Sequence, residues 1–235
     1  MKNYSNKNPL ESSETTFLAM VIHDLKTPII AEICALETLL KNKPPSSFEY
    51  ALINDMLEAA KYMKTLVENL LIKYKTETNQ LILQPEPCPI ENIIQKCIEE
   101  THYLIKDKKQ KITFKNQTKD SVCNVDFIEI KRTIHNLLTN ANQHSKTKAN
   151  INIILKETNT DFIIEITNPN NISTNPNFSK DIFDKYIEHS QSSKTVNTGL
   201  GLYICKQIIE LHNGKIYHKK LPRNKTLFGF NLPKQ

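Results

Sequence analysis

Apolar residues recur at helical spacing in two long segments near the start of the chain. The first segment, residues 14–42, holds no glycine, and most of its apolar positions lie three or four residues apart: Phe17, Val21, Ile22, Leu25, Ile29, Ile33, Leu36 and Leu40. Pro44 and Pro45, which cannot continue a helix, end it. The apolar positions of the second segment follow a repeat of about 3.5 residues: Ile53, Leu57, Ala60, Met63, Val67, Leu70, Leu71 and Tyr74. The pattern predicts two long helices joined by a short turn.

These two helices are expected to form an antiparallel hairpin. Ser46 and Glu49 make an S-x-x-E capping box at the start of the second helix. A hairpin with so long an apolar stripe is expected to bury it against a second copy, which gives a four-helix bundle in a homodimer. We therefore predict a polar tail over residues 1–14 and a helical dimerisation domain over residues 15–80.

A different pattern follows over residues 81–235. Residues 77–89 are interrupted by prolines, as in a linker or edge segment. Beyond them we predict helices over residues 90–106, 126–144 (with Asp126 as N-cap) and 199–211, and short strands in KITFKNQ, SVCNVD, NINIILKE, DFIIEITN, KIYHKK and TLFGFNL. Helices beside a mixed, mostly antiparallel sheet indicate the α+β class, here a two-layer α/β sandwich. The Asn- and Ser-rich residues 168–198 are expected to form a lid or loop.

Composition narrows the function classes. Only four of the 235 residues are glycine, all from Gly199 onward, which excludes a glycine-rich phosphate loop over most of the chain. The net charge of +6 comes from scattered lysines, so no nucleic-acid partner is expected. The chain has neither a long unbroken apolar run nor an apolar leader, so we expect no membrane span and no secretion. Five cysteines without a CxxC pair favour a reducing cytoplasm over a zinc site.

The segment HDLKTP, residues 23–28, holds the first candidate chemistry. His23 and Thr27 lie four positions apart and share a helical face. Pro28 cannot donate to the carbonyl of Asp24, which loosens the helix beside His23. If Asp24 accepts the imidazole Nδ1–H, Nε2 keeps a free lone pair as nucleophile. A solvated helix histidine with an acidic neighbour is the alternative, but a proline inside a helix costs about 3 kcal/mol or more and favours a functional site.

Three later segments follow HDLKTP in a fixed order. They are NLLTNANQH (residues 136–144), IFDKY (182–186) and TGLGLYICKQIIELHNGKI (198–216). The series resembles the phosphoacceptor box, Asn-rich helix, phenylalanine box and last glycine box of two-component sensor histidine kinases. The resemblance covers residues 15–233. It implies a phosphoacceptor hairpin followed by an ATP-binding domain of the histidine kinase/GHKL type.

The resemblance also implies a nucleotide site. Asn136 and Asn140 share a helical face, and amide oxygens suit Mg²⁺; the resemblance makes Asn140 the metal ligand. Residues 199–201 open a helix whose N–H groups face phosphate, and Gly214 is expected to terminate that helix. Thr226 matches a position that helps to hold adenine. The complete expected set for ATP is Asn136, Asn140, Gln143, His144, Asn168, Lys194, Gly199, Leu200, Gly201 and Thr226.

Two positions depart from the family pattern. After FIIEIT, where the family has an acidic residue and two spaced glycines, the chain reads NPNNIS. Asn168 stands in place of the adenine-reading aspartate; its side-chain oxygen can still accept from the adenine amino group, without the charge. Asn170 or Asn171 can replace a glycine at positive φ. Gln143 stands where the family commonly has a phosphate-contacting lysine. These departures predict a weakened or lost nucleotide site.

We therefore predict a histidine protein kinase that autophosphorylates His23 from ATP and Mg²⁺, with Asp24 orienting or deprotonating the imidazole. The phosphoryl group is expected to pass to an aspartate on a response-regulator receiver domain. Thr27 matches the position that orients water for regulator dephosphorylation. The alternatives are a phosphotransfer protein or regulator phosphatase with a weak or lost ATP site, and a non-enzymatic dimeric scaffold. No sensor segment precedes residue 15, so the input is expected from a separate sensor protein, unless the chain is an orphan component.

Overall fold

The computed structural model describes residues 9–41, 44, 47–169, 182–183 and 200–234. The chain divides into two units, Met1–Leu81 and Ile82–Gln235, and each is described by itself. Within the described residues, no helix combines the length and the apolar character needed to cross a bilayer.

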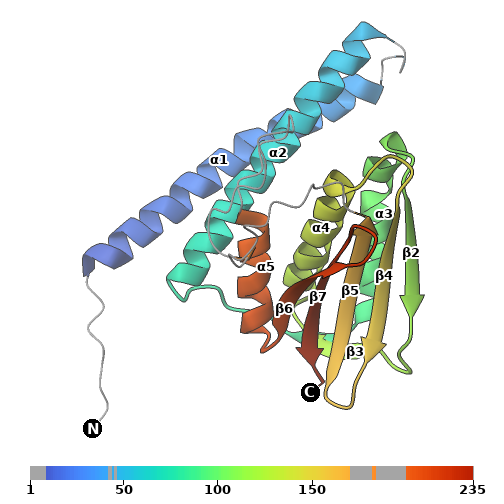
Figure 1. Ribbon diagram of the computed structural model, residues 1–235. Helices are drawn as coiled ribbons and strands as arrows, with labels where there is room; N and C mark the ends of the chain where they lie inside the picture. Colours follow the sequence, from blue (N-terminus) through green and yellow to red (C-terminus); the bar gives the residue numbers. More distant parts are fainter. Residues whose placement is uncertain (1–8, 42–43, 45–46, 170–181, 184–199, 235) are drawn as a thin grey trace. The chain divides into compact units, whose positions relative to one another are not determined.

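The first unit is a hairpin of two helices, α1 (Pro9–Lys41) and α2 (Phe48–Glu77), shown in Figure 1. Ion pairs join Lys26 to Glu68 at 3.3 Å and Glu37 to Lys61 at 3.9 Å, so the helices run antiparallel. Their buried contact consists of Leu36, Leu57 and Ala60, with Ile33, Leu40 and Ile53 packed around it. The predicted hairpin is confirmed.

Both helix starts differ from the sequence prediction. α1 begins at Pro9, inside the expected polar tail, because proline suits the first position of a helix, where its missing N–H is not needed. The N-cap of α2 is Ser47 and not Ser46: the Ser47 Oγ accepts from the Tyr50 backbone N–H at 3.1 Å. Adjacent serines satisfy the capping pattern equally well, and the register of the helix selects the second.

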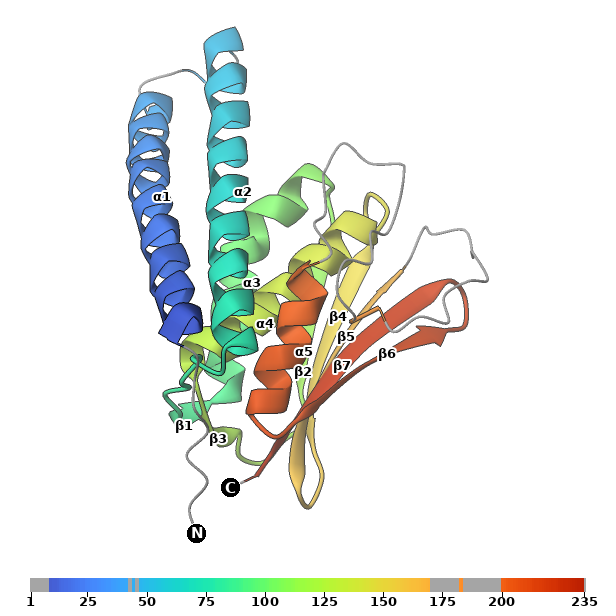
Figure 2. The ribbon, with the colours of Figure 1, turned by 90° about the vertical axis from the view of Figure 1, so that its left-hand side faces the viewer.

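The second unit is the predicted α+β two-layer sandwich. Its elements are β1 (Glu86–Pro89), α3 (Ile90–Asp107), β2 (Lys111–Asn116), β3 (Val122–Val125), α4 (Phe127–His144), β4 (Asn150–Glu157), β5 (Asp161–Pro169), α5 (Leu200–Leu211), β6 (Lys215–Leu221) and β7 (Lys225–Pro233). The main sheet has the order β2-β4-β5-β7-β6, in which only the β2–β4 pair is parallel. β1 and β3 form a separate antiparallel pair. Helices α3, α4 and α5 lie on one face of the main sheet (Figures 1 and 2).

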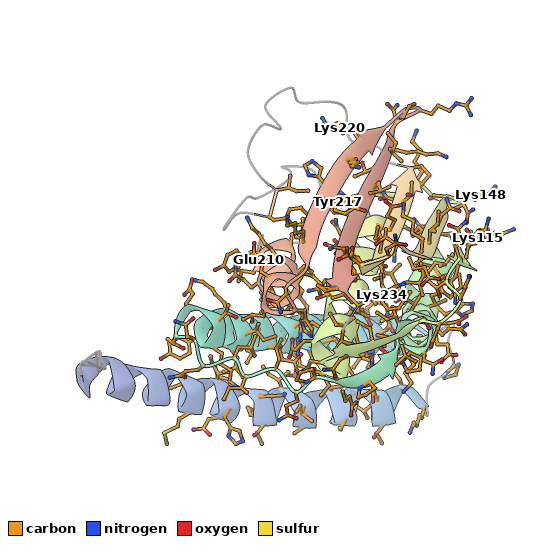
Figure 3. The ribbon with its side chains drawn as sticks, turned by 90° about the horizontal axis from the view of Figure 1, so that it is seen from below. Lys115, Lys148, Glu210, Tyr217, Lys220 and Lys234 are labelled. Atoms are coloured by element: carbon orange, nitrogen blue, oxygen red, sulfur yellow. The ribbon has the colours of Figure 1, made fainter. Side chains whose placement is uncertain are left out.

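The core of this unit lies between the sheet and the helices. Alternate residues of β4 and β5 point into it, and α4 contributes its apolar face; the buried set includes Ile130, Ile134, Leu137, Leu138, Ile151, Ile153, Leu155, Phe162, Ile164 and Ile166. The other face of the sheet carries polar pairs. There the Tyr217 hydroxyl of β6 (Figure 3) donates to Glu165 at 2.9 Å, and Lys156 contacts the second oxygen of Glu165 at 2.9 Å. Asn168, the last of the alternating buried positions of β5, therefore faces the helices.

The end of α5 differs in detail from the expectation that Gly214 terminates the helix. The residue in the left-handed region is Asn213, with φ 59°. The Gly214 N–H bonds to the Ile209 carbonyl at 2.9 Å and the Asn213 N–H to the Glu210 carbonyl at 2.9 Å, which is a Schellman motif with Asn213 as its left-handed residue. Gly214 is needed for a different reason: a Cβ there would lie 2.1 Å from the Asn231 carbonyl oxygen of β7.

This close approach predicts that Gly214→Ala destabilises the second unit by about 1–3 kcal/mol, since the new methyl group must push β7 away. Asn213→Gly is the matched control and should change the free energy of unfolding by less than about 1 kcal/mol, because glycine adopts positive φ freely. Chemical denaturation of both variants measures the difference. Equal stability of Gly214→Ala and the parent chain would show that the contact with Asn231 is not a constraint.

Candidate functional site

His23 lies on α1 with its side chain 79% exposed, and that of Asp24 is 80% exposed. The His23 Nδ1 is 3.3 Å from the Asp24 Oδ1. When Nδ1–H is donated to Asp24, Nε2 carries the lone pair and can attack an electrophile. The helix continues through Pro28, whose missing N–H leaves the Asp24 carbonyl without its helical donor. The exposed imidazole is thus open to large partners.

Thr27 lies one turn beyond His23. Its Oγ1 donates to the His23 backbone carbonyl at 3.4 Å, in an exposed part of the helix. The side chain therefore shares the face of His23, as the spacing predicts.

Asn136 and Asn140 lie one turn apart on α4, and both are half-buried. The Asn136 Nδ2 is buried and has no nitrogen or oxygen acceptor among the described residues. A Cβ on Gly201 would lie 3.9 Å from this nitrogen, so the structure brings the Asn-rich helix and the first turn of α5 together. The neighbouring Cys205 is not a nucleophile, because burial raises the pKa of its thiol to about 12. At this interface the α4 amides, and not the Cys205 thiol, are therefore the groups that can bind a ligand.

The last turn of α4 carries Gln143, which is exposed, and His144, which is half-buried. These positions continue the face of Asn136 and Asn140, since they follow at spacings of seven and eight residues. A neutral glutamine side chain at this end of the helix adds hydrogen-bonding capacity but no positive charge for a phosphate.

Asn168 and Thr226 are brought together by the sheet. They are directly opposite in the antiparallel register of β5 and β7, and Asn168 is only 2% exposed. The Asn168 Nδ2 donates to the Ser145 Oγ at 3.0 Å and to the Pro169 carbonyl at 3.4 Å. Its Oδ1 is buried and has no hydrogen-bond partner in the part of the chain that the structure describes. An unpartnered buried acceptor beside a half-buried threonine suits a ligand that brings an amino donor.

Phe183 of the IFDKY segment is buried against the end of the sheet. Its ring centroid lies 6.3 Å from that of Phe228 on β7 and 6.2 Å from that of His218 on β6, in edge-on arrangements. Phe228 is two residues beyond Thr226, so the phenylalanine segment packs beside the Asn168–Thr226 pair. This aromatic contact anchors the described part of the segment between β5 and α5.

Of the remaining residues predicted to bind ATP, Leu200 lies within the described part of the chain. Leu200 is the first residue of α5 and is half-buried. Lys194, Gly199, Asn170 and Asn171 lie outside the described residues, as does most of the expected lid.

Two features of the site were missed by sequence reasoning. Ser145, the C-cap of α4, orients Asn168, and the only local signal for it is a polar residue at the helix end. His212 joins α5 to α4: its Nε2 accepts from the Asp126 N–H at 3.0 Å and its Nδ1 donates to the Ile208 carbonyl at 2.8 Å. The Asp126 carboxylate also accepts from the Gln84 N–H at 2.9 Å. The sequence signal for this contact was the histidine in the segment HNGK.

The donor set fits a nucleotide with a hard metal ion. A buried acceptor at Asn168 without a partner among the described residues suits an amino group of a base, and the buried Asn136 Nδ2, which has no nitrogen or oxygen acceptor there, suits a phosphate oxygen. Asn140 supplies an amide oxygen, the ligand type that Mg²⁺ accepts. Asn136 and Asn140 thus present neutral amides, which can bind phosphate and metal without a fixed charge.

Comparison with known families divides the chain in the same order. Residues 13–79 match the His Kinase A (phospho-acceptor) domain. Residues 125–235 match the histidine kinase-, DNA gyrase B- and HSP90-like ATPase family.

Curated relatives are sensor proteins. The chain is 28% identical over 233 residues to the sensor protein KdpD of Clostridium acetobutylicum, which covers 96% of this chain and 25% of that protein. It is 30% identical over 226 residues to the adaptive-response sensory kinase SasA of a Synechocystis species, covering 92% of this chain and 58% of the relative. The chain thus spans a quarter to somewhat over half of the length of these relatives.

Solved structures share the fold. The histidine kinase AdeS of Acinetobacter baumannii aligns with a TM-score of 0.62 at 20% identity, over 91% of this chain and 98% of that one. Full-length ShkA in complex with AMPPNP aligns with a TM-score of 0.72 at 16% identity, over 93% of this chain and 45% of that one. With a phosphoacceptor hairpin followed by an ATPase domain of this type, the chain belongs to the sensor histidine kinases and comprises their two-domain core.

Proposed function

We propose that this chain is an ATP-dependent protein-histidine kinase that phosphorylates His23 and passes the phosphoryl group to an aspartate of a response regulator. The observation that carries the proposal is the exposed His23–Asp24 pair, 3.3 Å apart, on the hairpin of a chain that also holds the ATPase domain.

The residues of the chain divide the chemistry between them. Asp24 holds the Nδ1 proton and directs the Nε2 lone pair of His23 at the γ-phosphorus of ATP, in line with the departing ADP oxygen. Asn168 and Thr226 hold the base, while Asn136 and the first turn of α5 contact phosphate oxygens. Asn140 would hold Mg²⁺, which neutralises charge on the phosphates when bound.

A second copy of the chain is the proposed partner of the hairpin. Four apolar side chains of α2 remain 40–51% exposed, namely Leu52, Met56, Met63 and Leu70. They recur at spacings of four and seven residues, which places them on one face of the helix. A homodimer would bury this face in a four-helix bundle. A response regulator, and a separate sensor protein as the source of the input, are the other proposed partners.

His23→Ala is expected to abolish incorporation of label from γ-labelled ATP, because no other side chain of HDLKTP offers an uncharged nitrogen nucleophile. His102→Ala is the matched control, since His102 is an exposed helical histidine of the ATPase unit, and it should retain full labelling. Acid-labile, base-stable label distinguishes phosphohistidine from phosphoserine. Labelling that persists in His23→Ala would overturn the assignment of the acceptor.

Asn140→Ala should weaken binding of a non-hydrolysable ATP analogue roughly tenfold or more in the presence of Mg²⁺, since it removes a metal ligand. In the presence of a chelator, Asn140→Ala and the parent chain should bind the analogue with the same affinity. Calorimetry under both conditions gives the comparison. An equal loss with and without Mg²⁺ would assign Asn140 to the nucleotide itself and not to the metal.

The second candidate function is that of a regulator phosphatase, because the segment NPNNIS departs from the nucleotide-binding pattern of the family. The variant Thr27→Ala distinguishes this function from that of a kinase. We expect autophosphorylation of His23 to persist, because the Thr27 Oγ1 donates to the local backbone carbonyl of His23 and not to its imidazole. Dephosphorylation of a phosphorylated receiver domain should slow by about a hundredfold if the hydroxyl orients the attacking water. Time courses of autophosphorylation and of receiver dephosphorylation, measured on the same protein preparation, give the comparison. A chain that binds no nucleotide but dephosphorylates the receiver through Thr27 would be a phosphatase and not a kinase.

A further inference from the structure

Asn168 differs from a carboxylate in one respect that matters for reading a base. A carboxylate presents acceptors on both sides, whereas a primary amide presents an acceptor at Oδ1 and a donor at Nδ2. Rotated by half a turn, the same side chain would offer a donor to the base. Selection of one base therefore requires that something hold the amide in one orientation.

Ser145 holds it. The Ser145 Oγ donates its single proton to the Ala141 carbonyl at 2.6 Å, so toward Asn168 it can only accept. It accepts from the Asn168 Nδ2 at 3.0 Å. In the rotated orientation Oδ1 would face the lone pairs of the Ser145 oxygen, which leaves two buried acceptors without a proton between them.

The serine itself is held by its surroundings. Ser145 is 6% exposed, and its backbone carbonyl accepts from the Gln110 Nε2 at 3.3 Å. The Gln110 Nε2 also lies 3.2 Å from the Asn142 carbonyl, so the end of α4 is fixed to the loop before β2. The hydrogen-bond chain from Ala141 through Ser145 to Asn168 is therefore rigid at its origin, and the Asn168 Oδ1 at its end has no hydrogen-bond partner among the described residues.

We propose that Ser145 is a positioning residue that makes the site selective for a purine with an amino group at position 6. It does so by locking the Asn168 amide with Oδ1 as the only group offered to the base. The inference rests on the proposed binding of ATP. A 6-oxo purine, as in inosine triphosphate, brings an acceptor to this position and is rejected because Oδ1 cannot supply a proton. Adenine is thus chosen without the carboxylate of the family pattern.

The test compares binding of ATP and inosine triphosphate, measured by calorimetry on the intact chain. The parent chain should prefer ATP. Ser145→Ala frees the amide to rotate, so the preference for ATP over inosine triphosphate should fall by about tenfold, with inosine triphosphate binding more tightly than before. Ser145→Cys, which keeps the volume but offers a weak hydrogen-bonding atom, should act in the same direction and guards against a variant that fails to fold.

The matched control is the same substitution in an Asn168→Asp background. A carboxylate has no donor end, so Ser145→Ala should leave the ratio of the two affinities unchanged there. In the nucleotide-free chain, NMR of the Asn168 side-chain amide should show slow proton exchange that becomes faster in Ser145→Ala.

The outcomes are separable. Equal weakening of both nucleotides in Ser145→Ala would mean that Ser145 supports only the fold and would overturn the proposal, as would unchanged amide exchange. A parent chain that binds ATP and inosine triphosphate equally would overturn the selectivity while leaving the kinase proposal intact. A parent chain that binds neither nucleotide would overturn both.

Discussion

The packing of α4 against the main sheet and beside α5 is the constraint on which the proposed nucleotide site depends. Ile134, Leu137 and Leu138 of α4 are fully buried, so the rotation of the helix about its axis is fixed. That rotation places Asn136 against the start of α5 and carries Ser145, at the end of the helix, to the end of β5. A slip of α4 by one residue would turn its amides into the core and its leucines outward.

Two capped ends keep this helix in register. At its start the Asp126 carboxylate accepts from the backbone N–H groups of Ile128 and Glu129, and its own N–H is held by His212. At its end Lys108 donates to the carbonyls of Asn142 and Gln143 at 2.9 Å and 3.1 Å, which also places a positive charge at the negative end of the helix dipole. Neighbouring elements therefore fix both ends of α4, and with them the positions of the site residues that this helix carries.

The parts that the sequence predicts well are those whose cause is local. The helix from Asp126 to His144 follows from one capping residue and an apolar period, and β4 and β5 follow from strict alternation. The errors arise where the deciding contact is distant in sequence. Gly214 is required by the Asn231 carbonyl of another strand, while its neighbour Asn213 carries the left-handed turn. Ser145 matters only because β5 ends beside it, which no local pattern around residue 145 indicates.

Asn168 shows how a departure from a family pattern changes what the surrounding residues must supply. Burying a carboxylate at a position only 2% exposed is costly unless it is paired, and an amide avoids that cost. The amide brings a new requirement, because its two ends are chemically opposite and an error in orientation reverses the hydrogen bond offered. The serine at the end of α4 meets this requirement with one hydroxyl proton that is already committed to the Ala141 carbonyl. In the proposed site, geometry would therefore compensate for the loss of charge at the base, and selectivity would depend on Ser145 as well as on the residue that touches the base.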